Sequence, residues 1–160
     1  MISVLLSTLN NTIKFINQSV ADLSDQEMVE QPTGIPNHAT WTLGHIIYCC
    51  QGVAVEIGFK GWLPDEWESI FGYGSTPVSD VSRYPSKSEL LKTLKDTGVR
   101  INHIIANLSE TTMKQSLSNV DIPTIEHLVY QVVISHTAFH AGQLAMWRRA
   151  VGKKSSAVFV

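Results

Sequence analysis

One segment of the chain, residues 123–152, reads PTIEHLVYQVVISHTAFHAGQLAMWRRAVG. Its apolar residues and two of its histidines recur at steps of three and four, which is the spacing of one face of an α-helix. Pro123 suits the first turn of a helix, and Gly152 lies where the pattern stops. The segment therefore predicts a long last helix whose core face carries Ile125, Val129, Val132, Val133, His136, His140, Leu144 and Trp147.

Three earlier segments carry the same period. They are residues 2–20, a stretch from Asn37 to about Phe59, and a stretch that begins at Ser86 or Ser88. Asn37 and the two serines are residue types that cap the start of a helix. No segment carries a convincing strand period. Four amphipathic helices of about 20 to 30 residues predict an all-α fold, a four-helix bundle.

The connection between the second and third helices, residues 58–85, is unusually long. Loops beyond about 12 to 15 residues are uncommon in compact domains and are often functional. This one is rich in glycine, proline and aromatic residues, among them Phe59, Trp62, Trp67, Phe71, Tyr73 and Tyr84. We expect it to pack down and to form a wall or lid of a pocket. Residues 1–152 are predicted to form one domain, and residues 153–160 a C-terminal tail without an assigned structure.

The composition limits the partners of the chain. Of the 160 residues, 44% are hydrophobic and 16% charged, against about 25% charged in typical proteins. So little charge, with a second helix that is apolar on two sides, predicts a homodimer. The net charge of −2 lacks the basic footprint of a protein that binds nucleic acid. No run of 18 apolar residues exists, so no membrane span is expected.

The two cysteines, Cys49 and Cys50, are neighbours on the predicted second helix. Their side chains would point about 100° apart, so a disulfide between them would distort the backbone. No other cysteine is available, and the N-terminus lacks the basic region of a signal peptide. A reduced, cytoplasmic setting is therefore expected.

Three of the six histidines are candidate metal ligands. His136 and His140 lie one turn apart on the core face of the last helix, and unpaired polar groups buried there would be costly. His45 lies on a stripe of the second helix that is expected to face the bundle interior. Three imidazoles would hold one divalent ion and leave coordination positions open. A hydrogen-bonded histidine pair in the core is the alternative. His103 and His127 are expected to face solvent, and His38 is expected to lie in a loop or behind the ligands.

Several residues around these histidines are candidates for a place behind the ligands or for contact with a substrate. Cys49, one turn after His45, is either a soft fourth ligand or a packed thiol. Glu56 is either a base or orienting carboxylate, or a surface residue. Gln143 shares the face of His136 and His140, and either holds a ligand water or braces the helix pair. Trp41 and Tyr48 complete the stripe around His45.

Several known metal sites and cofactor sites are excluded. The residues between His136 and His140 are Thr137, Ala138 and Phe139, so the glutamate of the H-E-x-x-H zinc proteases is missing. No E-x-x-H occurs, which excludes a ferritin-like di-iron site. No G-x-S-x-G, phosphate-binding loop or dinucleotide-binding glycine motif is present.

Two stretches resemble the DinB/YfiT-like superfamily of metal-binding four-helix bundles. Residues 37–46, NHATWTLGHI, resemble its W-x-x-G-H segment, and residues 136–144, HTAFHAGQL, resemble its H-x-x-x-H-x-G-Q pattern. The resemblance covers nearly the whole chain. It implies that His45, His136 and His140 bind one zinc or nickel ion, and that dimers are common. Relatives include thiol S-transferases and thiol-dependent isomerases.

These observations lead to a functional hypothesis with two rivals. The favoured hypothesis is a metal-dependent enzyme that acts on a small molecule, with a low-molecular-weight thiol activated by the metal. One rival is a hydrolase that uses metal-bound hydroxide. The other is a metal-binding bundle without turnover, in which the ion only ties two helices together. The sequence identifies neither the substrate nor the catalytic residues.

Overall fold

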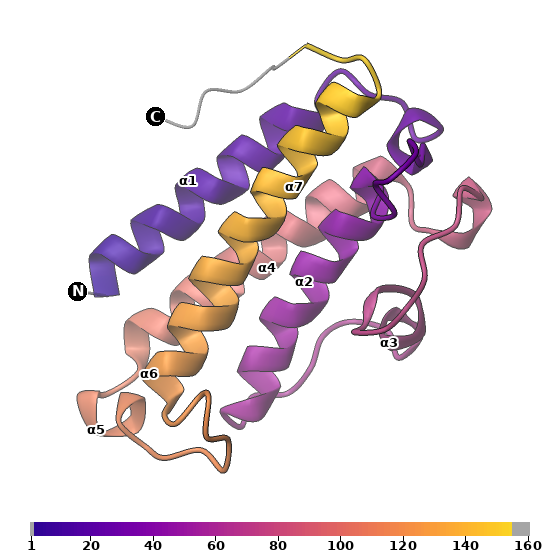
Figure 1. Ribbon diagram of the computed structural model, residues 1–160. Helices are drawn as coiled ribbons and strands as arrows, with labels where there is room; N and C mark the ends of the chain where they lie inside the picture. Colours follow the sequence, from indigo (N-terminus) through magenta and orange to yellow (C-terminus); the bar gives the residue numbers. More distant parts are fainter. Residues whose placement is uncertain (1, 155–160) are drawn as a thin grey trace.

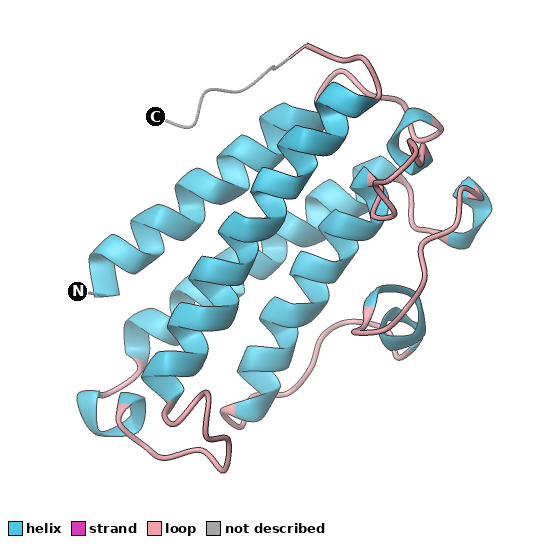
Figure 2. Ribbon diagram, viewed as in Figure 1, coloured by secondary structure: helices cyan, strands magenta, loops and turns pink. Residues whose placement is uncertain are grey.

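Four long helices run side by side in the computed structural model, which describes residues 2–154 (Figure 1). They are α1 (Ile2–Val20), α2 (Ala39–Glu56), α4 (Lys87–Asn107) and a last helix built from α6 (Ile125–Leu128), η3 (Val129–His136) and α7 (Thr137–Ala150). No strand occurs within the described residues (Figure 2). The predicted all-α four-helix bundle is confirmed.

The starts of two helices differ from their predicted positions. The second helix was expected to begin near Asn37, but His38 is its cap, because Nδ1 of His38 accepts a hydrogen bond of 3.1 Å from the backbone N–H of Trp41. The last helix begins after Thr124, not at Pro123. The third begins after Ser86, where Ser86 and Glu89 form a reciprocal capping box.

Helix α2 is the most enclosed of the four. It packs against α3, α4, α7 and η3, so side chains all around its first three turns are buried. The largest fully buried side chains come from all four long helices and, with Met28 and Phe71, from two of the connections: Leu9, Ile16, Met28, Leu43, Ile46, Ile47, Phe71, Leu90, Leu94, Ile101, Ile105 and Trp147. This enclosure explains why the second helix is apolar around most of its circumference.

The segment η3 is a π-helix of eight residues that ends at His136. A π-helix bonds residue i to i+5, so it carries more residues per turn than an α-helix. Its buried residues are Val129, Val133 and Ile134, so positions four and five residues after Val129 both reach the core. Of the predicted core face, Val132 and His136 are only half-buried. Such segments frequently occur at functional sites.

The long connection after α2 is partly helical. It contains α3 (Glu66–Phe71) and η2 (Val81–Arg83), and short turns of helix also occur at η1 (Glu27–Val29) and α5 (Glu110–Met113). Helix α3 packs on α2, and Phe71 is fully buried. The ring of Phe71 lies where a side chain at Gly44 would be, because a Cβ added to Gly44 would sit 2.2 Å from it.

His38 ties the rest of the connection to the start of α2. Its Nδ1 accepts the cap hydrogen bond, so its proton is on Nε2, which lies 3.1 Å from the carbonyl oxygen of Val78 and 3.3 Å from the hydroxyl of Tyr84. The side chain is fully buried, and this burial lowers the pKa of His38 to about 4. The sequence placed His38 at the start of the second helix, as a loop residue or one behind the ligands; the structure has it there as a buried, neutral helix cap.

The C-terminal end of α7 is fastened to the end of α1. The buried guanidinium of Arg148 donates two hydrogen bonds of 2.7 Å to the carboxylate of Asp22 and one of 3.0 Å to the carbonyl of Ser19. Lys153 forms an ion pair with Glu27. Of the predicted tail, residues 155–160 lie outside the described part, and the boundary between domain and tail stays a prediction.

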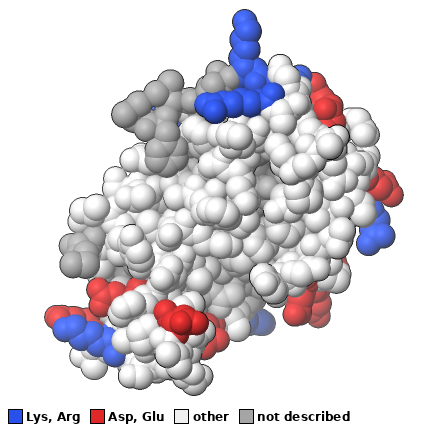
Figure 3. Space-filling model, in the orientation of Figure 1, with Lys and Arg blue, Asp and Glu red and all other residues white. Residues whose placement is uncertain are grey.

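Charged side chains surround an uncharged area in the face shown in Figure 3. The area lies over α7 and α2, which have no Lys, Arg, Asp or Glu at residues 39–55 and 128–147. Phe139 and Met146 of α7 are exposed, at 61% and 57% of their surface. A second copy would pack here in the predicted homodimer, which stays a prediction. No described helix is long and apolar enough to cross a membrane.

Replacing Gly44 with Ala should destabilise the fold, because the new Cβ would displace the ring of Phe71. Overpacking of this kind costs about 1–3 kcal/mol. Gly52→Ala is the matched control, since Gly52 lies in the same helix and an added Cβ meets nothing within 4 Å. That change should be neutral or stabilise by up to about 1 kcal/mol. Urea unfolding of both variants measures the difference, and equal midpoints would contradict the packing described for Phe71.

The metal-free protein should become less stable as the pH is lowered, because His38 takes up a proton more readily in the unfolded chain. Its pKa is about 4 in the folded chain, against about 6.5 when unfolded. The unfolded chain therefore binds more protons between these values, and the free energy of unfolding decreases as the pH falls from about 6.5 to about 4. His38→Asn keeps an acceptor for the Trp41 N–H but does not titrate. Its pH dependence should be shallower by about 1–3 kcal/mol over this window; parallel curves in urea titrations would rule out the assignment.

Candidate metal centre

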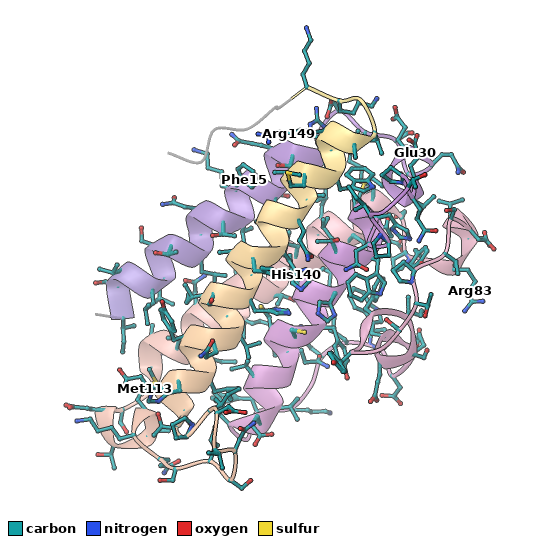
Figure 4. All side chains as sticks on the ribbon, in the orientation of Figure 1. Phe15, Glu30, Arg83, Met113, His140 and Arg149 are labelled. Carbon is teal, nitrogen blue, oxygen red and sulfur yellow. The ribbon has the colours of Figure 1, made fainter. Side chains whose placement is uncertain are left out.

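Three histidines from two sides of the bundle meet in its interior. His45 comes from α2, His136 ends η3 and His140 belongs to α7, where it lies on the side facing α2 (Figure 4). Nε2 of His136 lies 3.3 Å from Nε2 of His45 and 3.0 Å from Nε2 of His140. The three residues form a group that could hold a metal ion. The structure thus brings together the residues predicted as ligands.

Hydrogen bonds on the far side of two rings fix which nitrogen faces the centre. Nδ1 of His45 donates to the carbonyl oxygen of Phe71 at 2.6 Å, and Nδ1 of His140 donates to Oε1 of Gln143 at 2.8 Å. Each ring therefore presents the unprotonated Nε2 to the centre when it is neutral. Outer partners of this kind orient metal-binding histidines. Gln143 therefore supports His140 from behind, on the side of the ring away from the centre.

All three rings are neutral near pH 7. Burial, and after it the neighbouring His45, lowers the pKa of His136 to about 4. Burial, followed by the neighbouring His136 and His45, lowers the pKa of His140 to about 4. Burial also lowers the pKa of His45. Neutral imidazoles are the form that binds metal, so the pocket holds the three side chains ready for a cation.

The donor set fits a divalent ion better than it fits a hydrogen-bonded cluster. A neutral His136 has one proton for two facing acceptors, the Nε2 atoms of His45 and His140. Its Nδ1 is buried without a hydrogen-bond partner among the described residues. One ion would satisfy all three Nε2 lone pairs. Two nitrogens about 2.0–2.1 Å from the same ion lie about 2.9–3.4 Å apart for bond angles of 90–110°, which spans both measured distances.

Trp41 forms one wall of the centre. Its indole stacks on the ring of His45, with centroids 4.5 Å apart and planes at 11°. The indole N–H donates to the hydroxyl of Ser75 at 2.9 Å, so the stacked ring is held from the long connection. Trp41 is buried and has no free polar group toward the centre. The structure therefore places it as a support for His45.

Cys49 lies beside the centre. Its Sγ is 3.6 Å from Nε2 and 3.9 Å from Nδ1 of His45, yet it does not belong to the group formed by the three histidines. Burial raises the pKa of Cys49 to about 11, so it is a thiol at neutral pH. The thiol is a neighbour of the site in this arrangement, and its role as a fourth ligand stays a prediction.

A groove of about 460 Å³ starts at Cys49 and is also lined by Tyr48 and Glu56. Its other wall is the segment from Leu117 to Ile122, together with Leu128 and Val132. No residue between 59 and 84 lines it. The long connection was expected to form the wall or lid of the pocket. In the structure, the long connection hydrogen-bonds His45 through Phe71 and Trp41 through Ser75. The second wall of the groove is formed instead by the segment before the last helix.

Sequence reasoning missed two parts of this site. The acceptor for His45 is the backbone carbonyl of Phe71, and a carbonyl leaves no signal in residue type. The segment from Leu117 to Ile122 has no motif, and only the fold brings it to α2.

His103 and His127 are exposed, as predicted.

Comparison with known proteins agrees with this structure. The fold is similar to the crystal structure of a conserved protein from Enterococcus faecalis, with a TM-score of 0.80 and 18% sequence identity over 94% of this chain and 97% of that chain. A search of curated proteins found no match. The family model of the DinB superfamily matches residues 9–144. The chain belongs to the DinB superfamily.

Proposed function

We propose that this protein is a metal-dependent enzyme that activates a small thiol at the centre formed by His45, His136 and His140. The observation that carries the proposal is the donor set. It consists of three neutral imidazoles, and no carboxylate belongs to the described group. A bound divalent ion would keep its full charge and would lower the pKa of a thiol at an open position.

The chemistry of the donors favours a thiol over water. Three neutral ligands leave the positive charge uncompensated, so an anion is the preferred fourth partner. A thiolate is a softer ligand than hydroxide and matches zinc or nickel better. The thiol transferases among the relatives implied by the sequence resemblance support the same choice.

The surrounding residues supply orientation and access. Phe71 and Gln143 hold two rings with Nε2 toward the centre, and Trp41 prevents the ring of His45 from tilting. Cys49 lies between the centre and the groove, so a thiol that arrives from the groove passes its side chain.

Metal binding is the first test. The wild-type chain, dialysed against zinc or nickel, should hold about one ion per chain in elemental analysis. His136→Ala should lose it, because two imidazoles remain. Gln143→Ala should keep the site but lower its affinity by about 10–100-fold, since His140 loses its outer partner. His127→Ala is the control, because His127 is exposed on the same helix. Full metal content in His136→Ala would disprove the site.

The identity of the fourth ligand is the second test. Cobalt loaded in place of the native metal gives a strong charge-transfer band when a thiolate binds it. We expect no band in the protein alone and a band when 2-mercaptoethanol is added, in the wild type and in Cys49→Ser alike. A band that exists before any thiol is added, and disappears in Cys49→Ser, would make Cys49 the ligand and contradict the proposal. Absence of any band would favour hydrolytic chemistry or a bundle without turnover.

A further inference from the structure

The groove beside the metal centre has a defined floor on α2. Cys49, Gly52, Val53 and Glu56 line it, and these positions follow the spacing of one helix face. The facing wall is mostly apolar, with Leu117, Ile122, Leu128 and Val132, and it also includes the polar Ser118 and Asn119. The volume of about 460 Å³ is in the range of small-molecule sites, about 300–1,000 Å³.

Gly52 gives the groove its depth. A Cβ added there would meet nothing within 4 Å, so the space above Gly52 is open. Every other residue type would place a side chain into this space. A glycine inside a helix costs about 0.5–1 kcal/mol relative to alanine, and the packing of the protein does not require it here. Gly52 therefore leaves room for an occupant other than the protein itself.

The segment that closes the groove is held in place by its own hydrogen bonds. Leu117 donates its N–H to the carbonyl of Pro123 at 2.9 Å, and Ser116 bridges to Thr124. Oδ1 of Asn119 accepts the backbone N–H groups of Asp121 at 2.9 Å and Ile122 at 3.3 Å. The wall is thus an ordered turn placed against α2.

The groove has one charged end. Glu56 is the only Asp, Glu, Lys or Arg among the described residues that line it. It lies seven residues after Cys49, which corresponds to about 10.5 Å along a helix axis. Cys49 touches His45 of the metal centre at the other end. An occupant that reaches from the metal to Glu56 must therefore be elongated, apolar in the middle and cationic at its far end.

We infer that the groove binds an aliphatic thiol that carries a cationic amine, with its sulfur toward the metal centre and its amine at Glu56. This inference rests on the proposed function for the sulfur end, and on the groove alone for the amine end. The apolar walls cover the methylene groups, and the carboxylate of Glu56 attracts an ammonium and repels a carboxylate. Anionic thiols of the same length are poor ligands.

Three thiols of equal length test the charge preference: 6-amino-1-hexanethiol, 6-mercapto-1-hexanol and 6-mercaptohexanoate. Each is titrated into the cobalt-loaded protein, and the charge-transfer band reports binding. We expect the amine to bind about fivefold or more tightly than the carboxylate, because an exposed charge pair contributes modestly. In Glu56→Gln the difference should shrink to less than about twofold. An unchanged preference in this variant would overturn the role of Glu56.

Blocking the groove tests its location. Gly52→Leu should weaken all three six-carbon thiols by about tenfold or more, because its side chain takes their place. The short 2-mercaptoethanol should keep its affinity. Gly142→Leu is the matched control, since Gly142 is also a helical glycine with open space around an added Cβ but does not line the groove. It should leave all four affinities unchanged.

Ligands without sulfur separate the groove from the metal chemistry. Hexylamine and hexanoate are titrated into the zinc-loaded protein labelled with ¹⁵N, and amide shifts of Val53 and Leu117 report occupancy. We expect shifts with hexylamine that are absent in Gly52→Leu. If these shifts occur but no thiol gives a cobalt band, the amine end of the inference stands and the thiol function fails. If 2-mercaptoethanol gives a band while hexylamine and the six-carbon thiols show no dependence on Gly52, the inference is overturned and the thiol function stands.

Discussion

The hydrogen bond from Nδ1 of His45 to the carbonyl of Phe71 is the contact on which the site depends. At 2.6 Å it fixes the protonation of the ring, and it presents Nε2 to His136 and His140. The bond exists because Gly44 has no side chain, which lets the ring of Phe71 lie against α2. A single glycine thus permits the close approach that connects the long segment after α2 to the metal centre.

The π-helix η3 is the irregular part of the last helix. Ile125 and Leu128 are buried before it, Val129, Val133 and Ile134 within it, and His140 and Leu144 after it. His136, its last residue, is half-buried, and its Nε2 lies 3.3 Å from Nε2 of His45 and 3.0 Å from Nε2 of His140. The irregular turn is therefore part of how the site is built.

Charge is distributed to leave the site and its surroundings uncharged. The three rings are neutral, the thiol of Cys49 is protonated, and α2 and α7 carry no charged residue near the centre. In such surroundings the charge of a bound ion is weakly screened, so it acts strongly on its fourth ligand. Glu56 is the one carboxylate among the described residues that line the groove, and it lies two turns from Cys49.

The sequence by itself determined the helices, the bundle and the three histidines. The steps of three and four are a property of the chain, and His136 and His140 are one turn apart in any helical arrangement of that segment. The stripe of His45 on the second helix was expected to face inward, and the resemblance to the DinB superfamily assigned His45 as the third ligand. The helical segments and the spacing of His136 and His140 depend on local periodicity, which a linear sequence records directly.

Only the tertiary structure decided what surrounds the histidines. The carbonyl of Phe71, the oxygen atoms of Val78 and Tyr84 beside His38, and the wall from Leu117 to Ile122 all lie far in sequence from the residues beside them, and none has a residue pattern. The π-helix that ends at His136 was also not predicted from the sequence, because a segment such as VYQVVISH is compatible with an α-helix and a π-helix alike. Helical periods follow from each segment alone, whereas backbone acceptors, groove walls and helix register are selected by packing between segments.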